Sequence, residues 1–242
     1  MNKLLLLSGQ DVPFVEAQVN IHQPKLSEVA LIGEKDYLIG TQFLLFDKEK
    51  YLTEQDKIDL SEQSNFQVFM SIMKSKLQSP YKTNALMVLQ ILFPEYNIKM
   101  GENGIELERG EITSYITEQN FEQYQDLVKV ICSLGKNKDK AEYKPIDAFA
   151  KKIAEKINKG KQKRNKQNGT EGDEDISIIY KMAVTLSVGL GIGMSEVMDY
   201  SIYRANVLYN TFQAKKQFDN LFRIKLAGGG EKDELINWEN EI

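Results

Sequence analysis

Apolar and polar residues alternate on both sides of a short turn at 101–104, which is the clearest strand pattern in the chain. The apolar members of the alternation are Tyr96, Ile98, Met100, Ile105 and Leu107. Alternation on either side of a turn that contains two glycines predicts a β-hairpin. A further strand over 112–116 would extend the hairpin into a small antiparallel sheet.

The N-terminus carries a second strand signal. Residues 4–7 and 12–21 are rich in apolar side chains, and the turn-forming residues 8–11 separate them. This pattern predicts a strand at 4–7 and a hairpin or small sheet made with the second stretch. Pro13 favours an edge position there, because proline cannot donate a hydrogen bond to a neighbouring strand.

Apolar residues that recur at steps of three and four predict helices around these strands. We expect a short helix over 26–32 that ends near Gly33. Two further helices are expected over 65–78 and 82–93, and Pro94 stops the second of them.

Thr117 is the expected N-cap of one more helix. The apolar face of this helix consists of Phe121, Tyr124, Val128 and Ile131. With the strands and helices above, the pattern predicts an α+β globular domain over residues 1–135.

Between 136 and 175 the chain becomes polar and charged. Residues 151–166 hold eight basic residues against the single acid Glu155, a local charge of +7, whereas the whole chain has a net charge of −4. This basic patch consists of Lys151, Lys152, Lys156, Lys159, Lys161, Lys163, Arg164 and Lys166. The pattern predicts a basic amphipathic helix over 146–159 and a flexible charged linker over 160–175.

Three interpretations of the basic patch stay open. It is a solvated helix face that runs into a linker, a docking site for an acidic partner protein, or a nucleic-acid contact. No aromatic residue for base stacking lies between 150 and 179, and the chain is acidic overall. Nucleic acid is therefore the least favoured partner.

A helical region is predicted over 176–242. Residues 176–194 are strongly apolar, but Lys181 and several glycine, serine and threonine residues favour a buried helix over a membrane span. Ser195 is the expected N-cap of a long helix that continues to Ala227. One packing face of this helix, spaced 4, 3, 4 and 3 residues apart, consists of Met198, Ile202, Ala205, Tyr209 and Phe212.

Aromatic residues of this region are the candidate partner-binding surface. Large apolar residues spread around more than one face of the long helix, and the only tryptophan lies in a polar tail, so some of them remain for a partner. The candidates are Tyr203, Tyr209, Phe212, Phe218, Phe222 and Trp238. The alternative is that the helix aromatics pack entirely against the rest of the chain.

No pattern in the chain indicates catalysis. His22 is the only histidine and Cys132 the only cysteine, which excludes paired-histidine zinc sites and disulfides within the chain. We expect His22 to be a surface or hydrogen-bonded structural residue and Cys132 a small buried one. The glycines at 189–193 lack GxGxxG spacing, so we expect them to end one helix and let another pack closely. We expect no enzyme activity, metal or cofactor.

Several stretches carry a resemblance to a known group of proteins. They are Val19–Val29 with its Gln-Pro pair, Gly33–Tyr37, the basic hinge Lys159–Lys163, Ile202-Tyr203, Leu226–Gly230, and Trp238 shortly before Ile242. In this order they resemble the opening, hinge and close of bacteriophage tail assembly chaperones, small proteins encoded near the tape measure.

The resemblance implies a non-catalytic protein of the host cytoplasm that binds the tape measure protein and recruits tail tube subunits. A lone cysteine and a leucine run too short for a signal peptide agree with a reducing compartment. The alternatives are a structural tail or baseplate component of the virion, and a nucleic-acid-binding protein that uses 151–166. Self-association is also left open.

Overall fold

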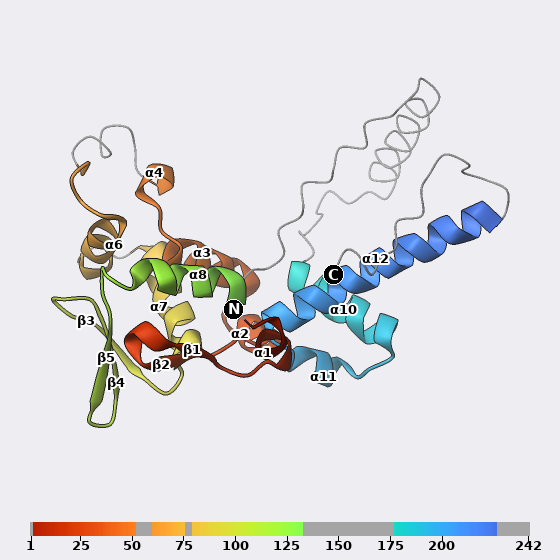
Figure 1. Cartoon of the computed structure of the whole chain (residues 1–242), viewed down its shortest axis with the longest axis horizontal. Helices are drawn as coiled ribbons and strands as arrows, with labels where there is room; N and C mark the ends of the chain where they lie inside the picture. Colours follow the sequence, from red (N-terminus) through yellow and green to blue (C-terminus); the bar gives the residue numbers. More distant parts are fainter. Residues whose placement is uncertain (1, 52–59, 76–78, 133–176, 227–242) are drawn as a thin grey trace, which may run out of the picture.

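A computed structural model describes residues 2–51, 60–75, 79–132 and 177–226. The chain has an α+β fold, as the sequence predicts, in which helices pack around two small antiparallel sheets. Figure 1 shows the sheets and most helices gathered in one body, from which helix α12 projects. The predicted linker, the predicted basic helix and Trp238 lie outside the described residues.

The predicted hairpin and its third strand are confirmed. Strands β3 (Asn97–Met100), β4 (Ile105–Arg109) and β5 (Ile112–Ile116) form an antiparallel sheet in the order β3-β4-β5. Ile105, Leu107 and Ile116 are fully buried, because alternate residues of a strand point to the same face.

The prediction of a strand at 4–7 is wrong. Lys3–Ser8 forms helix α1, because the Asn2 side chain accepts a hydrogen bond from the Leu4 N–H and Gly9 ends the helix in a left-handed conformation, with φ 74°. A run of leucines has no periodicity that separates helix from strand, and leucine is a strong helix former.

The N-terminal sheet lies wholly within the second apolar stretch. Strand β1 (Val12–Phe14) pairs antiparallel with β2 (Val19–Ile21), and the 3-10 helix η1 (Val15–Ala17) connects them. Because this sheet has two strands, Pro13 is on an edge strand, as predicted.

The helices expected from apolar spacing are confirmed, with one corrected start. They are α2 (Leu26–Ile32), α6 (Asn65–Lys74), α7 (Pro80–Leu92) and α8 (Phe121–Ile131). Thr117 is not the N-cap of α8. Asn120 holds that position, and its side-chain oxygen accepts a hydrogen bond of 2.8 Å from the Thr117 N–H.

Helix α3 (Glu34–Leu44), which the sequence pattern does not predict, forms the centre of the core with α7. The short helix α4 (Lys48–Tyr51) follows α3. Gly40 of α3 lies directly against the backbone of Asn84 in α7. A chain of ring contacts, with centroids 5.5, 5.2 and 6.1 Å apart, runs beside them through Phe43, Phe69, Phe121 and Tyr124. The core is therefore built on one close helix pair and a row of aromatic rings.

The C-terminal region contains α10 (Ile178–Leu190), α11 (Met194–Met198) and α12 (Ile202–Leu226). Ser195 is not the N-cap of the long helix, contrary to the prediction, because it lies within the short α11. Instead the hydroxyl of Ser201 accepts a hydrogen bond of 3.2 Å from the Arg204 N–H at the start of α12.

The two predicted domains are in direct contact within the described residues. The Ile202 N–H donates to the Pro24 carbonyl at 2.8 Å, and the Leu26 N–H donates to the Tyr200 carbonyl at 3.0 Å. These backbone hydrogen bonds hold the chain between α11 and α12 against the start of α2. The domain borders at 135 and 175 fall outside the described residues and stay a prediction.

His22 is a hydrogen-bonded structural residue, as expected. Its Nδ1 lies 2.9 Å from Asp11 Oδ1 and its Nε2 lies 3.1 Å from Glu28 Oε2, and Glu28 also accepts a hydrogen bond from the Lys25 N–H. The hydrogen bond to Glu28 outweighs partial burial and, with Asp11, raises the pKa of His22 above its ordinary value. Partial burial favours a higher pKa for Glu28, but the hydrogen bonds from His22 and Lys25 outweigh it and lower that pKa.

We expect the free energy of unfolding to fall as the pH rises through the pKa of His22. The folded chain holds this proton more tightly, so the stabilisation is complete below the ordinary pKa of 6.5 and is lost as the pH passes the raised value. His22→Gln should lower the free energy of unfolding by about 1 kcal/mol at pH 6 and remove this pH dependence. The urea midpoints of unfolding of the unsubstituted chain and of His22→Gln, each at pH 6 and pH 8.5, measure this effect. If the midpoint fell by the same amount between the two pH values in both proteins, the prediction would be contradicted.

Candidate protein-docking surface

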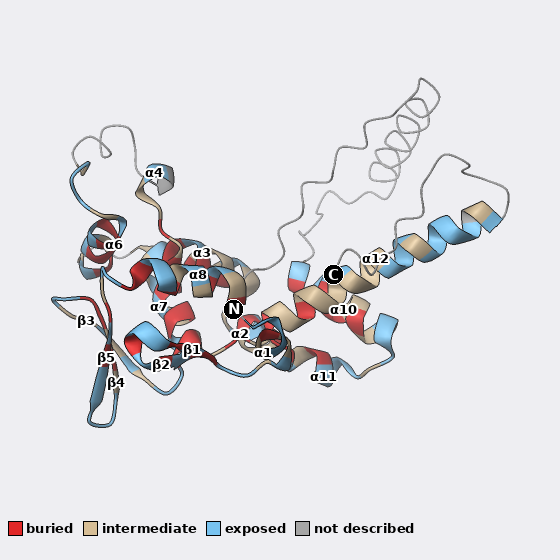
Figure 2. Cartoon of the chain, viewed as in Figure 1, coloured by how far each residue is buried: buried red, intermediate tan, exposed pale blue. Residues whose placement is uncertain are grey.

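Helix α12 is anchored at one end and projects at the other. Its 25 residues give a length of roughly 37 Å. Ile202 and Ala205 are fully buried, and Tyr203, Leu208 and Tyr209 are partly buried against the same core. Figure 2 shows buried and intermediate positions giving way to exposed ones toward the C-terminal end of α12. The first half of the helix therefore belongs to the core.

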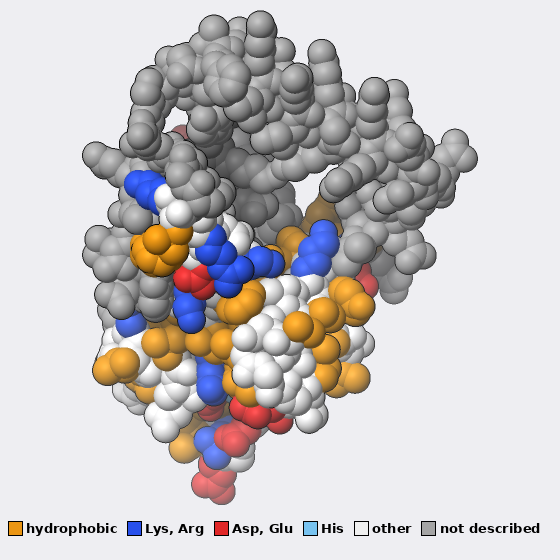
Figure 3. Space-filling view, turned by 90° about the vertical axis from the view of Figure 1, so that its right-hand side faces the viewer, with side chains coloured by type: hydrophobic (Ala, Val, Ile, Leu, Met, Phe, Trp, Pro, Cys, Tyr) orange, Lys and Arg blue, Asp and Glu red, His pale blue; other side chains and the backbone are white. Residues whose placement is uncertain are grey.

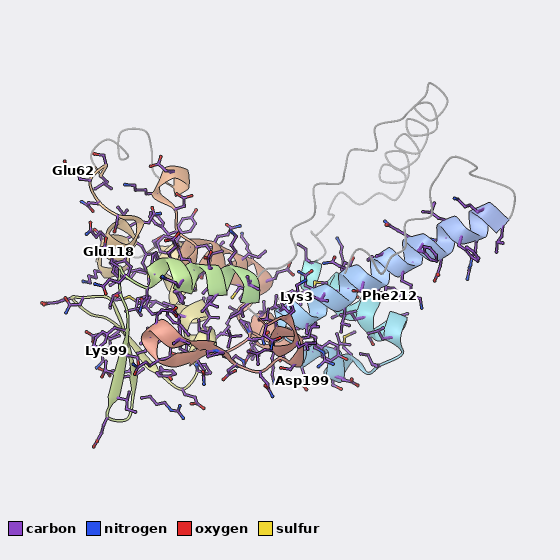
Figure 4. All side chains as sticks on the ribbon, viewed as in Figure 1. Lys3, Glu62, Lys99, Glu118, Asp199 and Phe212 are labelled. Carbon is purple, nitrogen blue, oxygen red and sulfur yellow. The ribbon has the colours of Figure 1, made fainter. Side chains whose placement is uncertain are left out.

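The interpretation of the glycines at 189–193 is confirmed. Gly191 ends α10 in a left-handed conformation, with φ 67°. A Cβ atom at Gly189 would come within 2.5 Å of the Phe212 ring, so the missing side chain lets α12 cross α10 closely. Figure 4 labels Phe212 at this crossing. Part of the Phe212 ring is therefore used for packing α12 on α10.

Large apolar residues are exposed in the distal half of α12, which we define as residues 213–226. Leu221, Phe222 and Leu226 are 36%, 45% and 73% exposed, and the Phe218 ring stacks on the Phe222 ring with 6.2 Å between centroids. Figure 3 faces this end of the molecule and shows hydrophobic and basic side chains next to each other. The distal half combines apolar contact area with positive charge.

A second apolar surface is a groove outside α12. Helices α2, α10 and α11 line a groove of about 530 Å³, whose lining includes Ile179, Tyr180, Val184, Met194 and Met198. Two of these residues, Tyr180 and Met194, are 61% and 43% exposed. Because methionine side chains adapt to irregular surfaces, the groove is a second apolar surface that can accept side chains of a partner.

The structure divides the predicted partner-binding residues into two groups. Tyr203 and Tyr209 pack partly against the core, and Phe212 packs on α10. Phe218 and Phe222 lie together on the distal half of α12. Of the described candidates, these two form one cluster at the surface, in which Phe222 is exposed and Phe218 is half-buried.

Some of the predicted partner-binding residues lie outside the described ones, and the sequence prediction missed two residues of the exposed cluster. Trp238 and the basic patch at 151–166 lie outside the described residues. Leu221 and Leu226, which sequence reasoning passed over in favour of aromatics, extend the exposed cluster. Their helical spacing from Phe218 and Phe222 is the signal that would have found them.

The described residues offer little reactive chemistry. No group of His, Cys, Asp and Glu side chains in the described ranges could hold a metal ion. Cys132 is 2% exposed, as predicted, and burial raises the pKa of its thiol to about 12, so it is not a thiolate nucleophile at neutral pH. None of the helices in the described ranges combines the length and the hydrophobicity that a membrane span requires.

Two of the stretches on which the resemblance was based, Val19–Val29 and Ile202-Tyr203, are in contact. The buried Gln23 donates from its amide to the carbonyls of Gln10 at 2.6 Å and Leu5 at 3.3 Å, and its neighbour Pro24 accepts from Ile202. The Gln-Pro pair and the start of α12 therefore belong to one junction of the fold. Comparisons with protein-family models, with curated proteins and with solved structures gave no significant match.

Proposed function

We propose that the chain is a non-catalytic assembly protein that holds another protein on its C-terminal helices, in the manner of bacteriophage tail assembly chaperones. The distal half of α12 carries this proposal, because its apolar residues are exposed while the same helix is rooted in the core. The resemblance at Val19–Val29 and Ile202-Tyr203 suggests the tape measure and tail tube proteins as partners.

The size of the exposed cluster supports binding rather than chance exposure. A single exposed apolar residue is ordinary, but Phe218, Leu221, Phe222 and Leu226 fall within nine residues of one helix. Complete burial of such a side chain contributes roughly 1.5–3 kcal/mol. A complex would bury the fractions of these four side chains that are still exposed, and only the surplus over the cost of association appears as affinity.

Co-expression with a tape measure protein tests the proposal. In the full chain, Phe218→Ser with Phe222→Ser should lower capture of that protein by roughly tenfold or more, because the exposed cluster is its contact surface. The matched control, Gln217→Ser with Asn220→Ser, changes exposed polar residues of the same turns and should retain capture. Circular dichroism should show that both variants fold. Equal capture by both variants would contradict the proposal.

Purified virions separate this function from the structural alternative that the resemblance also suggests. An assembly chaperone should be missing from the finished particle. A tail or baseplate component should be present at a fixed copy number. Quantitative mass spectrometry of virions distinguishes the two.

A further inference from the structure

The side chains of α12 form two rows on different faces of the helix. The inner row includes Ile202, Ala205 and Phe212 and packs on the core and α10. The second row, which we call the outer stripe, consists of Val207, Thr211, Ala214, Phe218 and Leu221 at steps of 4, 3, 4 and 3. At about 100° per residue, the outer stripe lies about 140° around the helix from Phe212.

The spacing of the outer stripe fits a second helix. Steps of four and three residues are the spacing of a coiled-coil seam. None of its five residues is buried, and Val207 and Phe218 are not among the partly buried residues that pack against the core within the described ranges. The stripe is narrower than the apolar face with which a helix lies on a membrane. A helix is therefore the shape that matches it.

The charge around the distal half specifies the partner further. Its charged residues are Lys215, Lys216, Asp219, Arg223 and Lys225, a net charge of +3. At about 100° per residue, Lys225 lies in line with the outer stripe and Lys215 about 80° to its side, whereas Lys216 and Arg223 lie on the opposite face. Within the described part of the chain, none of the four basic residues makes an ion pair or hydrogen bond. A second copy of the chain would bring equal positive charges together, whereas a helix with acidic residues would neutralise them.

We propose that the outer stripe binds an amphipathic helix with acidic flanks, supplied by the partner protein. This inference rests on the proposed function and specifies the chemistry of the partner. Apolar residues of the partner helix, repeating about every 3.5 residues, contact Ala214, Phe218 and Leu221. Its Asp or Glu residues face Lys215 at the side of the outer stripe and Lys225 at its C-terminal end.

Two synthetic helical peptides test the inference. Both carry leucines at coiled-coil spacing, and they differ only in having glutamate or lysine at the flanking positions. The full chain should bind the acidic peptide roughly tenfold more tightly in fluorescence anisotropy at 50 mM NaCl, and the preference should shrink at 500 mM NaCl. Lys215→Glu with Lys225→Glu should reverse the preference. Phe218→Ser with Leu221→Ser should weaken both peptides, while the control Asn220→Ser leaves both unchanged.

Several results would overturn the inference. Equal binding of the two peptides, or no binding of either, would remove the acidic helix as the occupant. Dimers seen by light scattering and abolished by Phe218→Ser with Leu221→Ser would assign the outer stripe to a second copy. Binding to phosphatidylserine vesicles that the same variant abolishes would assign it to a lipid surface.

Failure of the inference is distinguishable from failure of the proposed function. Undiminished tape measure capture by Lys215→Glu with Lys225→Glu would overturn the acidic-helix chemistry and leave the function standing. Selective binding of the acidic peptide without capture of any tail protein would support the inference and count against the function.

Discussion

Replacing Gly40 by alanine is expected to lower the free energy of unfolding by about 3 kcal/mol or more. A Cβ atom at Gly40 would lie 2.3 Å from the carbonyl oxygen of Asn84, 2.6 Å from its carbonyl carbon and 2.7 Å from Cγ2 of Val88. The two nearest atoms belong to the backbone and cannot rotate away, so α3 and α7 would have to separate. At an open helix position the same change stabilises by about 1 kcal/mol. A loss of stability in Gly40→Ala, where an open helix position would gain stability, would therefore show that α3 and α7 need their close contact at Gly40.

A second substitution identifies the contact that matters. Val88→Ala removes only the side-chain contact, so adding Gly40→Ala to it should still destabilise the protein. Urea unfolding followed by circular dichroism compares the three variants with the unsubstituted chain. If Gly40→Ala were as stable as the unsubstituted chain, the close approach of α3 and α7 would not be needed for stability.

Removing the Glu34 carboxylate should cost about 2 kcal/mol and loosen the start of α10. Glu34, the first residue of α3, accepts hydrogen bonds from the Ser177 hydroxyl and from the N–H groups of Ile178 at 2.9 Å and Ile179 at 3.2 Å. The first N–H groups of a helix have no partner within the helix, and the helix dipole favours a negative charge beside them. Glu34 therefore caps a helix that lies far from it in sequence.

Charge and shape can be separated at this position. Glu34→Gln keeps one oxygen acceptor without the charge and should lose less stability than Glu34→Ala. Lys35→Ala, at the exposed neighbour, should change little. Hydrogen exchange of the amides at 178–181 measures the loosening, and unchanged exchange in Glu34→Ala would count against the capping role.

Local spacing made much of the fold predictable. The strands around the turn at 101–104 and the helices predicted over 65–78 and 82–93 follow from spacing within one strand or one helix. The sequence was therefore enough to find them, although not their ends. The first error was at the N-terminus, where a leucine run fits helix and strand equally and the caps at Asn2 and Gly9 decide for helix.

Helix starts were less predictable than helix faces. Thr117 and Ser195 are both suitable N-caps, yet Asn120 holds the N-cap position of α8, without a side-chain capping bond, and Ser201 caps α12. Each place offers more than one short polar side chain, so the sequence pattern does not single out the start of the helix. At the second place, the hydrogen bonds of residues 200–202 with residues 24–26 set where α12 begins.

The candidate site was only partly predictable for the same reason. Sequence spacing indicates that apolar residues surround the long helix on more than one face. Which of them remain exposed depends on what packs against each face. Phe212 is partly covered, because Gly189 has no side chain and α10 can therefore lie close to the Phe212 ring. Phe218 and Leu221 remain accessible because α12 continues past the body of the fold.

By itself, the sequence determined the α+β class, the sheet at 97–116, a buried Cys132 and a surplus of apolar residues on the C-terminal helix. Tertiary structure alone decided that α3 pairs with α7 through Gly40, that Glu34 caps α10, and which end of α12 is exposed. The physical reason is the distance along the chain over which each interaction acts. The spacing of apolar residues acts over one helix turn or one strand, whereas close approach, capping and exposure depend on residues that only folding brings together.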